Sequence, residues 1–526
     1  MPVILSAILS ATLAVTALGF EDGTSAGFHS TGNARVRVVA GGHGSDHALE
    51  LCDRDADWNS IELDLTGFAP AGSPCAFAAY VRQDTSDLAS FDLSLKDDPD
   101  DGEARYPTVA RCKARRGEWT LLKGAFPIGT GGTLPFVCRT DSTDAFRIDD
   151  VTVDCAAAYR EDEPETSIPR LKDAFAVRGM TCGASVGDAV LGERTGARKR
   201  LLARHFHSLS PENQLKASFL LDRGTSAADL AHYGENAALD FSAPRPWFEF
   251  ARANGMRVSA QALVWFMLTP EWWFHVDYDT EKPLASRPLM LKRLEGYIRG
   301  VLGWCETNYP GLVRSWVVVN ESVDGDATPR LHDDLFLRTI GEDYVERAFE
   351  FANRYRPRTD CVFLCNDSNL EGYPAKRDFL LNYLKRHRII ERKWVDGIGV
   401  QGHLKMDWPD AADIRSCCAA IRAAGLSVEV TELDVALSAA QIRAFGSPEE
   451  AFRRQAARYE EAVRAYSTAH ISWWGLTDAY SWISAFYGER SFPLLFDRQN
   501  RHKPAFDAVL RALSSDASKK HACCLR

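Results

Sequence analysis

The sequence lacks several features that would place it in common functional classes. Its 526 residues contain no CxxC pair, which makes a zinc site improbable. Acidic residues outnumber lysine and arginine, and the net charge of -10 argues against a nucleic-acid partner. After Phe20, no segment is apolar enough to span a membrane, so a membrane partner is not expected either. What is left is a globular chain of two or three domains whose partner can be a neutral molecule.

The N-terminus is a short apolar run, MPVILSAILSATLAVTALGF, followed by a charged segment. It is short for a membrane span, and Ala17 and Gly19 have the spacing that signal peptidase prefers. The run contains no lysine or arginine, so a buried first strand is the alternative. We expect residues 1–19 to be a signal peptide, the mature chain to start at Phe20, and the protein to be secreted, either extracellular or periplasmic.

The thirteen cysteines do not indicate one covalent framework. Disulfides are possible in the first part of the chain, but most cysteines lie inside apolar runs, where cysteine acts as a small hydrophobic residue. The cysteines of the first part are Cys52, Cys75, Cys112, Cys138 and Cys155. Their spacing does not define a pairing.

The pattern of apolar residues divides the chain into two domains. Residues 20–155 contain short alternating runs such as SIELDLTGF and FDLSLKDD between Gly, Pro and Asp turns, which predicts an all-β sandwich of the jelly-roll type. Residues 156–168 are charged and contain proline, as linkers do. From 169 to 515, strand-like runs alternate with amphipathic helical stretches, which indicates parallel βαβ units. Residues 516–526 form a tail ending in CCLR, a poor match to prenylation signals, and we assign it no role.

Eight strand candidates lie in the second domain. They are AFAVRGMTCGAS, HFHSLSPEN, RVSAQALVW, SWVVVNES, CVFLCNDSN, GIGVQGHL, SVEVTELDV and HISWWGLTD. Eight strands alternating with helices predict an α/β fold, the (β/α)₈ TIM barrel, whose strands all end on one face. Polar or aromatic residues stand at nearly every strand end: Glu212, Asn213, Trp265, Asn320, Glu321, Asn366, Asp367, Gln401, His403, Glu432, Asp434, Trp474 and Asp478. A purely structural barrel has no reason to gather them there.

Two glutamates at these strand ends are candidate catalytic residues. Glu321 and Glu432 each follow a run of β-branched residues, as carboxylates at the end of buried parallel strands do. Two carboxylates that meet across a cleft can cleave a glycosidic bond, because one protonates the leaving oxygen while the other attacks or activates water. For either glutamate alone, an ordinary strand-end ion pair is the alternative.

Neighbouring residues fit the same chemistry. Asn320 could hold a sugar hydroxyl beside the reacting carbon. His403 could donate to Glu432 while Asp434 orients its imidazole, although a histidine satisfied within the core is the alternative. Lys216 could bind sugar hydroxyls, and its alternative is a solvated charge. Trp265, Trp474 and Trp482 could provide flat walls for pyranose rings, or could be core residues.

At this point the sequence resembles glycoside hydrolase family 10, the retaining endo-β-1,4-xylanases. WVVVNES is similar to the family's WDVVNEA acid/base peptide, and VEVTELDV is similar to its ITELDV nucleophile peptide. SLSPENQLK, ALVWFMLTPEWW, LCNDSNL, GIGVQGHL, WWGLTDAYSWI and PLLFDRQNRHKPAF complete the match in family order over residues 170–512. The resemblance implies Glu321 as acid/base and Glu432 as nucleophile, with their carboxyl groups about 5–5.5 Å apart. It also implies a glycone-side site of Glu212, Asn213, Lys216, Asn320, Gln401, His403, Trp474 and Trp482.

The chain departs from the family at several positions. Gln261 stands where a sugar-binding histidine is usual, and we keep it with Trp265 as a candidate contact. Phe266 replaces a second histidine and Leu268 replaces a glutamine, so this wall is expected to be more apolar. Ser368 stands where the family has tyrosine, and Ala217 where it has tryptophan. Losing one or two substrate hydrogen bonds costs about 1–3 kcal/mol each, enough to change a substrate preference.

The first domain resembles a family 22 carbohydrate-binding module, or the related family 4/9 type. DWNSIELDLTG, YPTVARC, GEWTLLKGAF and DSTDAFRIDDVTV carry the resemblance, which implies sugar contacts at Trp58 and Tyr106. Cys138 replaces an expected glutamate, so a spacer or stabilising sandwich is the alternative. Modules of this type often hold a structural calcium, with which Asp149 and Asp150 are compatible.

These observations predict a secreted, retaining endo-β-1,4-xylanase that hydrolyses internal bonds of xylan by double displacement. One alternative is the same chemistry on another β-linked or heavily decorated glycan. Another is a carbohydrate-binding protein with a weakened barrel site. The expected partner is xylan or xylo-oligosaccharide, no catalytic metal or cofactor is required, and the protein is expected to be a monomer.

Overall fold

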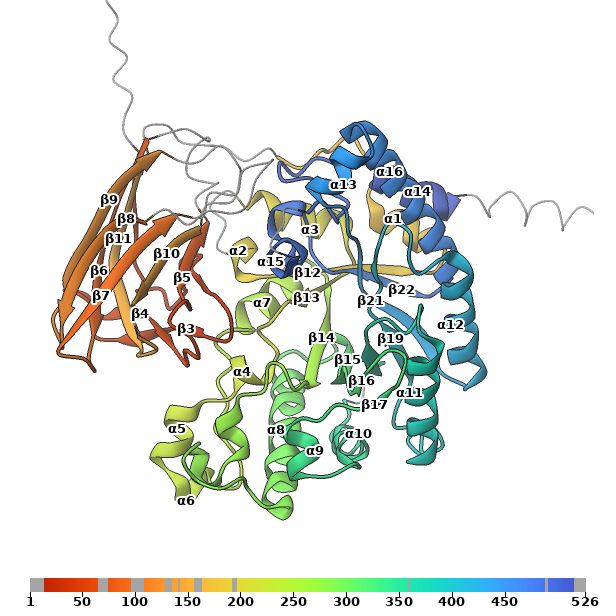
Figure 1. The fold of residues 1–526 in the computed structure, drawn as a ribbon, viewed down its shortest axis with the longest axis horizontal. Helices are drawn as coiled ribbons and strands as arrows, with labels where there is room; N and C mark the ends of the chain where they lie inside the picture. Colours follow the sequence, from red (N-terminus) through yellow and green to blue (C-terminus); the bar gives the residue numbers. More distant parts are fainter. Residues whose placement is uncertain are drawn as a thin grey trace, which may run out of the picture. The chain divides into compact units, whose positions relative to one another are not determined.

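A computed structural model describes residues 14–64, 74–95, 108–127, 135–140, 142–155, 163–191, 196–357, 360–487 and 491–514. The chain splits into two compact units (Figure 1). One consists mainly of residues 1–163, and the other consists mainly of residues 164–187, 198–487 and 491–526. No helix in the described part of the chain is both long and apolar enough to cross a membrane.

The first unit is a sandwich of two antiparallel sheets, as predicted. The first sheet has the order β3 (Arg35–Ala40), β4 (His47–Cys52), β11 (Phe146–Cys155), β6 (Pro74–Gln83), β9 (Thr120–Pro127), with β1 (Ala14–Leu18) also paired to β11. The second has the order β2 (His29–Ser30), β5 (Ile61–Asp64), β10 (Pro135–Thr140), β7 (Leu88–Leu95), β8 (Thr108–Arg115). Alternate residues of β5 are buried, and the core includes Phe77, Phe91 and Phe146. The period of two in the sequence therefore produces the one-sided burial of a sandwich strand.

Strand β1 consists of residues that the sequence assigned to a signal peptide. It pairs with β11 over five residues, from Ala14 opposite Cys155 to Leu18 opposite Val151. This pairing corresponds to the alternative of a first strand, while cleavage after Gly19 stays a prediction. Residues 156–162 of the predicted linker and the 516–526 tail lie outside the described residues.

The cysteines of the sandwich that can be placed are reduced. Cys52 and Cys112 are free thiols, and burial raises the pKa of Cys52 to about 12 and that of Cys112 to about 11. The side chains of Cys75, Cys138 and Cys155 lie outside the described residues. A disulfide among these three stays a prediction.

The second unit is a closed barrel of eight parallel strands, as predicted. In order around the barrel they are β12 (Thr181–Val186), β13 (Ser208–Pro211), β14 (Arg257–Val264), β15 (Val313–Asn320), β18 (Val362–Asp367), β19 (Gly397–Val400), β21 (Ser427–Val435) and β22 (His470–Trp473). Pairing of β22 with β12 closes the barrel. Most residues of these strands are buried, as expected where side chains fill the barrel and helices cover it.

Helices lie on the outside of the barrel strands (Figure 1). The α-helices of the described residues are α1 (Leu171–Val177), α2 (Asp188–Leu191), α3 (Ala197–His205), α4 (Ala217–Leu220), α5 (Arg223–Ala228), α6 (Leu230–Tyr233), α7 (Arg245–Ala253), α8 (Arg287–Asn308), α9 (Leu335–Thr339), α10 (Tyr344–Arg354), α11 (Pro374–Arg386), α12 (Ala411–Ala423), α13 (Ala439–Ala444), α14 (Pro448–Tyr466), α15 (Trp482–Tyr487) and α16 (Pro504–Ser514). Short strands β16 (Val323–Asp324), β17 (Arg330–Leu331) and β20 (His403–Leu404) lie in the loops.

The first strand candidate of the barrel was too long. The segment AFAVRGMTCGAS divides into the end of helix α1 and strand β12, with a turn at Gly179, whose φ is +66°. Leu171 and Phe175 are four residues apart and both buried, which is the spacing of a helix face. Strand β12 therefore begins only at Thr181.

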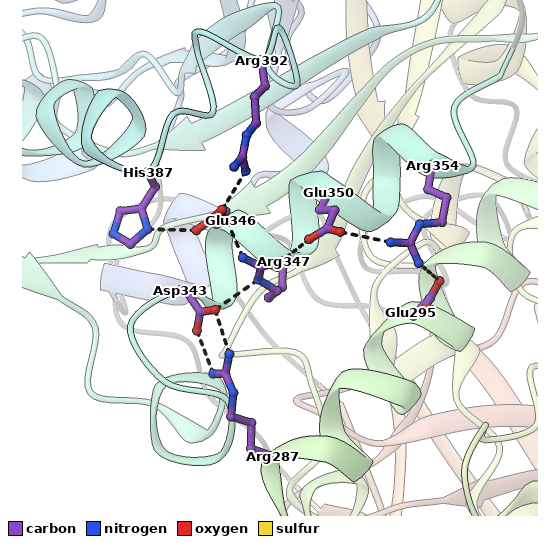
Figure 2. A network of polar contacts seen from close by, with 9 residues as sticks. All are labelled: Arg287, Glu295, Asp343, Glu346, Arg347, Glu350, Arg354, His387 and Arg392. Carbon is purple, nitrogen blue, oxygen red and sulfur yellow. Dashed lines mark hydrogen bonds and ion pairs between the residues drawn. The ribbon is translucent and has the colours of Figure 1, made fainter.

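Salt bridges tie helix α10 to its neighbours (Figure 2). Arg347 contacts Asp343, Glu346 and Glu350, which lie one turn or less from it along the chain. The other members extend the network to the segments around it: Arg287 on Asp343, His387 and Arg392 on Glu346, and Arg354 on Glu350 and Glu295. Because several charges share partners, the network contributes more than isolated surface pairs would.

The interior of the barrel holds a buried ion pair. Arg314 Nη2 lies 2.7 Å from Glu429 Oε1 and Arg314 Nη1 lies 2.9 Å from Glu429 Oε2, in a two-point contact between β15 and β21. The two side chains are 13% and 8% exposed, so water does not replace either partner if the other is removed.

The substitution Arg314→Met is expected to lower the free energy of unfolding by about 3–5 kcal/mol, because it leaves Glu429 buried without a partner. Urea unfolding followed by tryptophan fluorescence measures this. The double variant Arg314→Met, Glu429→Leu is expected to regain most of the loss. A single variant within about 0.5 kcal/mol of the wild type would contradict the importance of the pair.

Candidate active site

A cleft of about 840 Å³ lies at the carboxyl ends of the barrel strands. Its lining contains most of the residues proposed from sequence. These are Lys216, Gln261, Trp265, Asn320, Glu321, Gln401, His403, Glu432, Asp434, Trp474 and Trp482. The barrel therefore brings together residues from six different strands or their loops at one place.

Glu321 follows strand β15 in an unusual backbone conformation. Its φ is +51°, a region that residues other than glycine seldom occupy and that occurs at functional sites. Its N–H donates to the carbonyl of Asn366 at 2.9 Å, which fixes this turn to strand β18. Its carboxylate accepts from Gln401 Nε2 at 2.7 Å and from Trp265 Nε1 at 2.9 Å. Both carboxylate oxygens are thus oriented before any substrate binds.

Glu432 lies within strand β21 and has different partners. Its Oε1 accepts from Asn366 Nδ2 at 2.8 Å, and its Oε2 lies 3.2 Å from His403 Nε2. The other ring nitrogen of His403 lies 2.9 Å from Asp434 Oδ2, which also accepts from Trp482 Nε1 at 3.0 Å. Glu432 is therefore held by an amide on one side and by an oriented imidazole on the other.

A chain of side-chain amides connects the two glutamates. Asn320 Oδ1 lies 3.5 Å from Gln401 Nε2, the group that donates to Glu321. The same oxygen accepts at 2.8 Å from Asn366 Nδ2, the group that donates to Glu432. Thr431 Oγ1 donates at 2.6 Å to Asn366 Oδ1, which fixes the orientation of that amide. The relative position of the two carboxylates is thus set by buried hydrogen bonds.

The groups around His403 shift its pKa. Burial alone would lower its pKa, but Asp434 and Glu432 raise it well above the ordinary value. His403 therefore holds its second proton more tightly than a free histidine does.

We expect the nitrogen resonances of the His403 ring to show that the imidazole titrates above pH 6.5, because its pKa is raised. The pKa is raised on folding, so this contribution to stability is complete below about pH 6.5 and is lost as the pH rises through the raised pKa. Asp434→Asn should move the titration to lower pH. A His403 ring that titrates near pH 6.5 in the wild type would contradict this assignment.

Lys216 is buried between aromatic rings on one side of the cleft. Its Nζ lies 4.4 Å from the ring centre of Trp265 and 5.5 Å from that of Trp474, and it donates to Asn213 Oδ1 at 3.0 Å. Burial lowers its pKa, although Glu432, Glu212 and Glu321 oppose this effect. The alternative of a solvated charge is thus wrong, because Lys216 is buried and its ammonium group faces the site.

Two predicted contacts are partly exposed but do not line the cleft. Among the described residues, those that line the cleft do not include Glu212 or Asn213. Asn213 instead positions the ammonium of Lys216. Glu212 Oε2 lies where a Cβ on Gly187 would stand 2.7 Å away, so Gly187 leaves room for the glutamate.

The unusual third-strand peptide contributes differently from what was expected. Gln261 lines the cleft, while its Nε2 lies 3.5 Å from Ser210 Oγ. The described lining does not include Phe266 or Leu268. Phe266 stacks on His332, with ring centres 3.7 Å apart, and the exposed residue Met267 lines the cleft instead. The prediction of an apolar wall formed by Phe266 and Leu268 is therefore corrected.

Several site residues were given no role from the sequence, although Asn366 was among the polar strand ends. Asn366 and Thr431 orient the glutamates, and Asn366 carried the same signal as Asn320, because each ends a buried hydrophobic strand. Tyr373 and Trp408 line the cleft from loops, where no periodic pattern distinguishes a ligand contact from a core aromatic residue.

The predicted sugar contacts of the sandwich can be placed only in part. Trp58 is 53% exposed, a large apolar surface for a single side chain. Tyr106 lies outside the described residues, as does the side chain of Cys138. Sugar binding by this unit stays a prediction.

The candidate calcium residues of the sandwich have protein partners. Asp149 Oδ2 accepts from Ser45 Oγ at 2.6 Å and from the N–H of His43 at 2.7 Å, and Asp150 Oδ2 lies 2.8 Å from His43 Nδ1. Within the described ranges, no three His, Cys, Asp or Glu side chains are grouped as metal ligands. A calcium ion in this domain also stays a prediction.

Comparison with known proteins identifies both units. The sequence profile of glycosyl hydrolase family 10 matches residues 170–512, and that of a carbohydrate binding domain matches residues 14–141. The chain is 37% identical over 333 residues to endo-1,4-beta-xylanase B of Butyrivibrio fibrisolvens, a match covering 62% of the chain and 50% of the relative. It is 30% identical over 486 residues to endo-1,4-beta-xylanase A of Thermotoga neapolitana, covering 89% of the chain and 43% of the relative. The chain thus spans half or less of the length of these relatives.

Solved structures of other proteins have folds similar to those of both units. Native xylanase 10B from Thermotoga maritima matches with a TM-score of 0.58 at 26% identity, covering 67% of this chain and 100% of that one. The CBM22-1–GH10 modules of a Clostridium thermocellum endo-1,4-beta-D-xylanase, complexed with xylohexaose, match with a TM-score of 0.58 at 22% identity, covering 95% of this chain and 98% of that one, and show the fold alone. The chain belongs to glycosyl hydrolase family 10 and carries an N-terminal carbohydrate-binding domain.

Proposed function

We propose that the barrel is a retaining endo-β-1,4-xylanase. The observation that carries this proposal is the pair Glu321 and Glu432, held at one cleft by separate sets of hydrogen bonds and joined by a chain of amides. The curated relatives named endo-1,4-beta-xylanase support xylan as the substrate class.

The first step forms a covalent intermediate. The Glu432 carboxylate attacks the anomeric carbon, and the bond from that carbon to the leaving sugar breaks. The Glu321 carboxyl gives its proton to the departing oxygen. His403 beside Glu432 keeps the nucleophile oriented, and Trp265 and Gln401 keep Glu321 pointing at the bond.

The second step releases the glycone. Glu321, now a carboxylate, takes a proton from water while the water oxygen bonds to the anomeric carbon and the ester to Glu432 breaks. The glutamates return to their first states, so the cycle needs no metal or cofactor. Treatment with EDTA is accordingly expected to leave the rate unchanged.

A second candidate is the same reaction on another β-linked or heavily decorated glycan. The observation that favours it is Gln261 on the cleft surface, where the family resemblance implies a charged or hydrogen-bonding histidine. A carbohydrate-binding barrel without turnover is less favoured, because hydrogen bonds from neighbouring side chains orient both glutamates.

The substrate test is a panel of glucuronoxylan, arabinoxylan, mixed-linkage β-glucan and mannan, assayed by reducing ends and by viscosity. We expect activity on the xylans, with viscosity falling early as internal bonds break. Turnover of a glucan or mannan but of no xylan would favour the second candidate, and binding without hydrolysis would favour the third.

Export of the protein is a separate proposal, supported by the apolar N-terminal run with Ala17 and Gly19. N-terminal sequencing of the protein from the culture medium is expected to begin at Phe20. Protein that stays in the cell with residues 1–19 attached would contradict it.

A single peak at the monomer mass in light scattering is expected for the purified chain.

A further inference from the structure

The two glutamates divide the rim of the barrel into two arcs. Glu321 follows β15 and Glu432 lies on β21, and the shorter arc between them contains only β18 and β19. Lys216, Trp265 and Trp474 follow strands of the longer arc. Besides Gln401 and His403, the shorter arc contributes the following cleft residues: Ser368, Asn369, Tyr373, Leu404, Lys405, Asp407 and Trp408. Substrate that extends past the glutamates from the Lys216 side must therefore lie along the shorter arc.

Ser368, at the end of strand β18, offers no flat surface to a sugar. The aromatic rings of this arc that line the cleft come instead from loops, at Tyr373 and Trp408. Their ring centres lie 5.2 Å apart with a tilt of 57°, and both side chains are partly exposed. Tyr373 packs at this tilt against Trp408, whose indole lines the cleft with Lys405 Nζ 5.8 Å from its ring centre.

The indole of Trp408 is fixed in place without a ligand. It lies directly against the backbone of Gly372, where a Cβ would stand 2.0 Å from its Cζ2 atom. The turn that carries it closes with a hydrogen bond of 2.8 Å from Lys405 N–H to the Trp408 carbonyl. The carbonyl of Pro409 accepts from Arg458, and Asp410 caps helix α12 in a capping box. A ring held in this way loses little entropy when a sugar stacks on it.

We propose that Trp408 is the stacking platform for the leaving-group sugar of the substrate, a β-linked pyranose, with Tyr373 as its support. The apolar face of a pyranose fits the flat indole. Lys405 and Asp407 are exposed on the same turn and can bond the hydroxyls at the sugar's edge. This assignment rests on the proposed function, because it takes Glu321 to protonate the oxygen of the sugar that leaves.

The variant Trp408→Ala separates this role from catalysis at the glutamates. With xylohexaose, which must occupy the shorter arc, kcat/KM is expected to fall about 10- to 100-fold. With β-xylobiosyl fluoride, whose leaving group is a single fluoride ion, kcat/KM should change less than about twofold. Trp408→Phe keeps a flat ring and is expected to retain most activity on both substrates.

A second variant tests whether the loss in Trp408→Ala comes from the missing ring and not from a folding defect. Gly372→Ala places a methyl group against the indole and is expected to reproduce the selective loss on xylohexaose by displacing the ring. Equal losses on both substrates in the two variants, or no loss on xylohexaose, would overturn the platform. A wild type that cleaves neither substrate would instead contradict the proposed function, and the platform with it.

Discussion

Replacement of Glu432 by alanine is expected to abolish hydrolysis of xylan, with kcat falling by at least about 10⁴-fold. The substitution removes the group that forms the bond to the anomeric carbon, and no other described carboxylate is hydrogen-bonded to both Asn366 and His403. The cleft keeps its sugar-binding residues, so KM should change far less than kcat. Initial rates on xylan over a range of concentrations measure both.

Azide distinguishes a lost nucleophile from a damaged site. In Glu432→Ala, azide enters the space of the missing carboxylate and attacks an activated β-xylobioside, which should restore turnover and yield the α-azide. Glu281→Ala, at an exposed position outside the cleft, is the matched control and should behave as the wild type. A Glu432→Ala enzyme with normal activity would contradict the mechanism.

Replacement of Glu321 by alanine is expected to lower activity in proportion to how much the leaving group needs a proton. On xylan, kcat/KM should fall about 10²- to 10⁴-fold, the usual contribution of a positioned general acid. A xylobioside with a dinitrophenolate leaving group needs little protonation, so its covalent step should be nearly unchanged. Release of the glycone then becomes slow, because no base activates water, and a burst of dinitrophenol should precede a slow steady state.

Azide and the variant Gln401→Ala are the controls for Glu321→Ala. Azide should accelerate the steady state of Glu321→Ala and yield the β-azide, the opposite anomer from that of the Glu432 variant. Gln401→Ala, which removes one hydrogen bond to Glu321 but keeps the acid, should lose less activity. An equal loss on xylan and on the dinitrophenyl substrate, with no burst, would show that Glu321 is not the acid.

The sequence allowed the barrel and the catalytic pair to be predicted for a local reason. Glu321 and Glu432 each end or interrupt a buried run of β-branched residues, and in a parallel barrel all such positions share one face. The one strand that was misplaced, AFAVRGMTCGAS, failed because a short apolar helix face and a buried strand look alike over a few residues.

Contacts across the barrel could not be predicted from local sequence patterns. The amide chain through Asn320 and Asn366 joins residues that are separated by 46 positions in the sequence. Phe266 was expected in the wall of the cleft, but its ring stacks on that of His332, which lies on a different loop. Trp408 became a candidate platform only because Gly372 comes close to it in space. Such pairings depend on how the loops pack.

The most direct test of the account is to trap the covalent intermediate. The enzyme is incubated with a 2-deoxy-2-fluoro-β-xylobioside that carries a dinitrophenyl leaving group, digested, and the labelled peptide sequenced by mass spectrometry. We expect one fluoroxylobiosyl group per chain, attached to Glu432 within SVEVTELDV, and none in Glu432→Ala. An active enzyme that takes up no label, or a label on any residue other than Glu432, would contradict it.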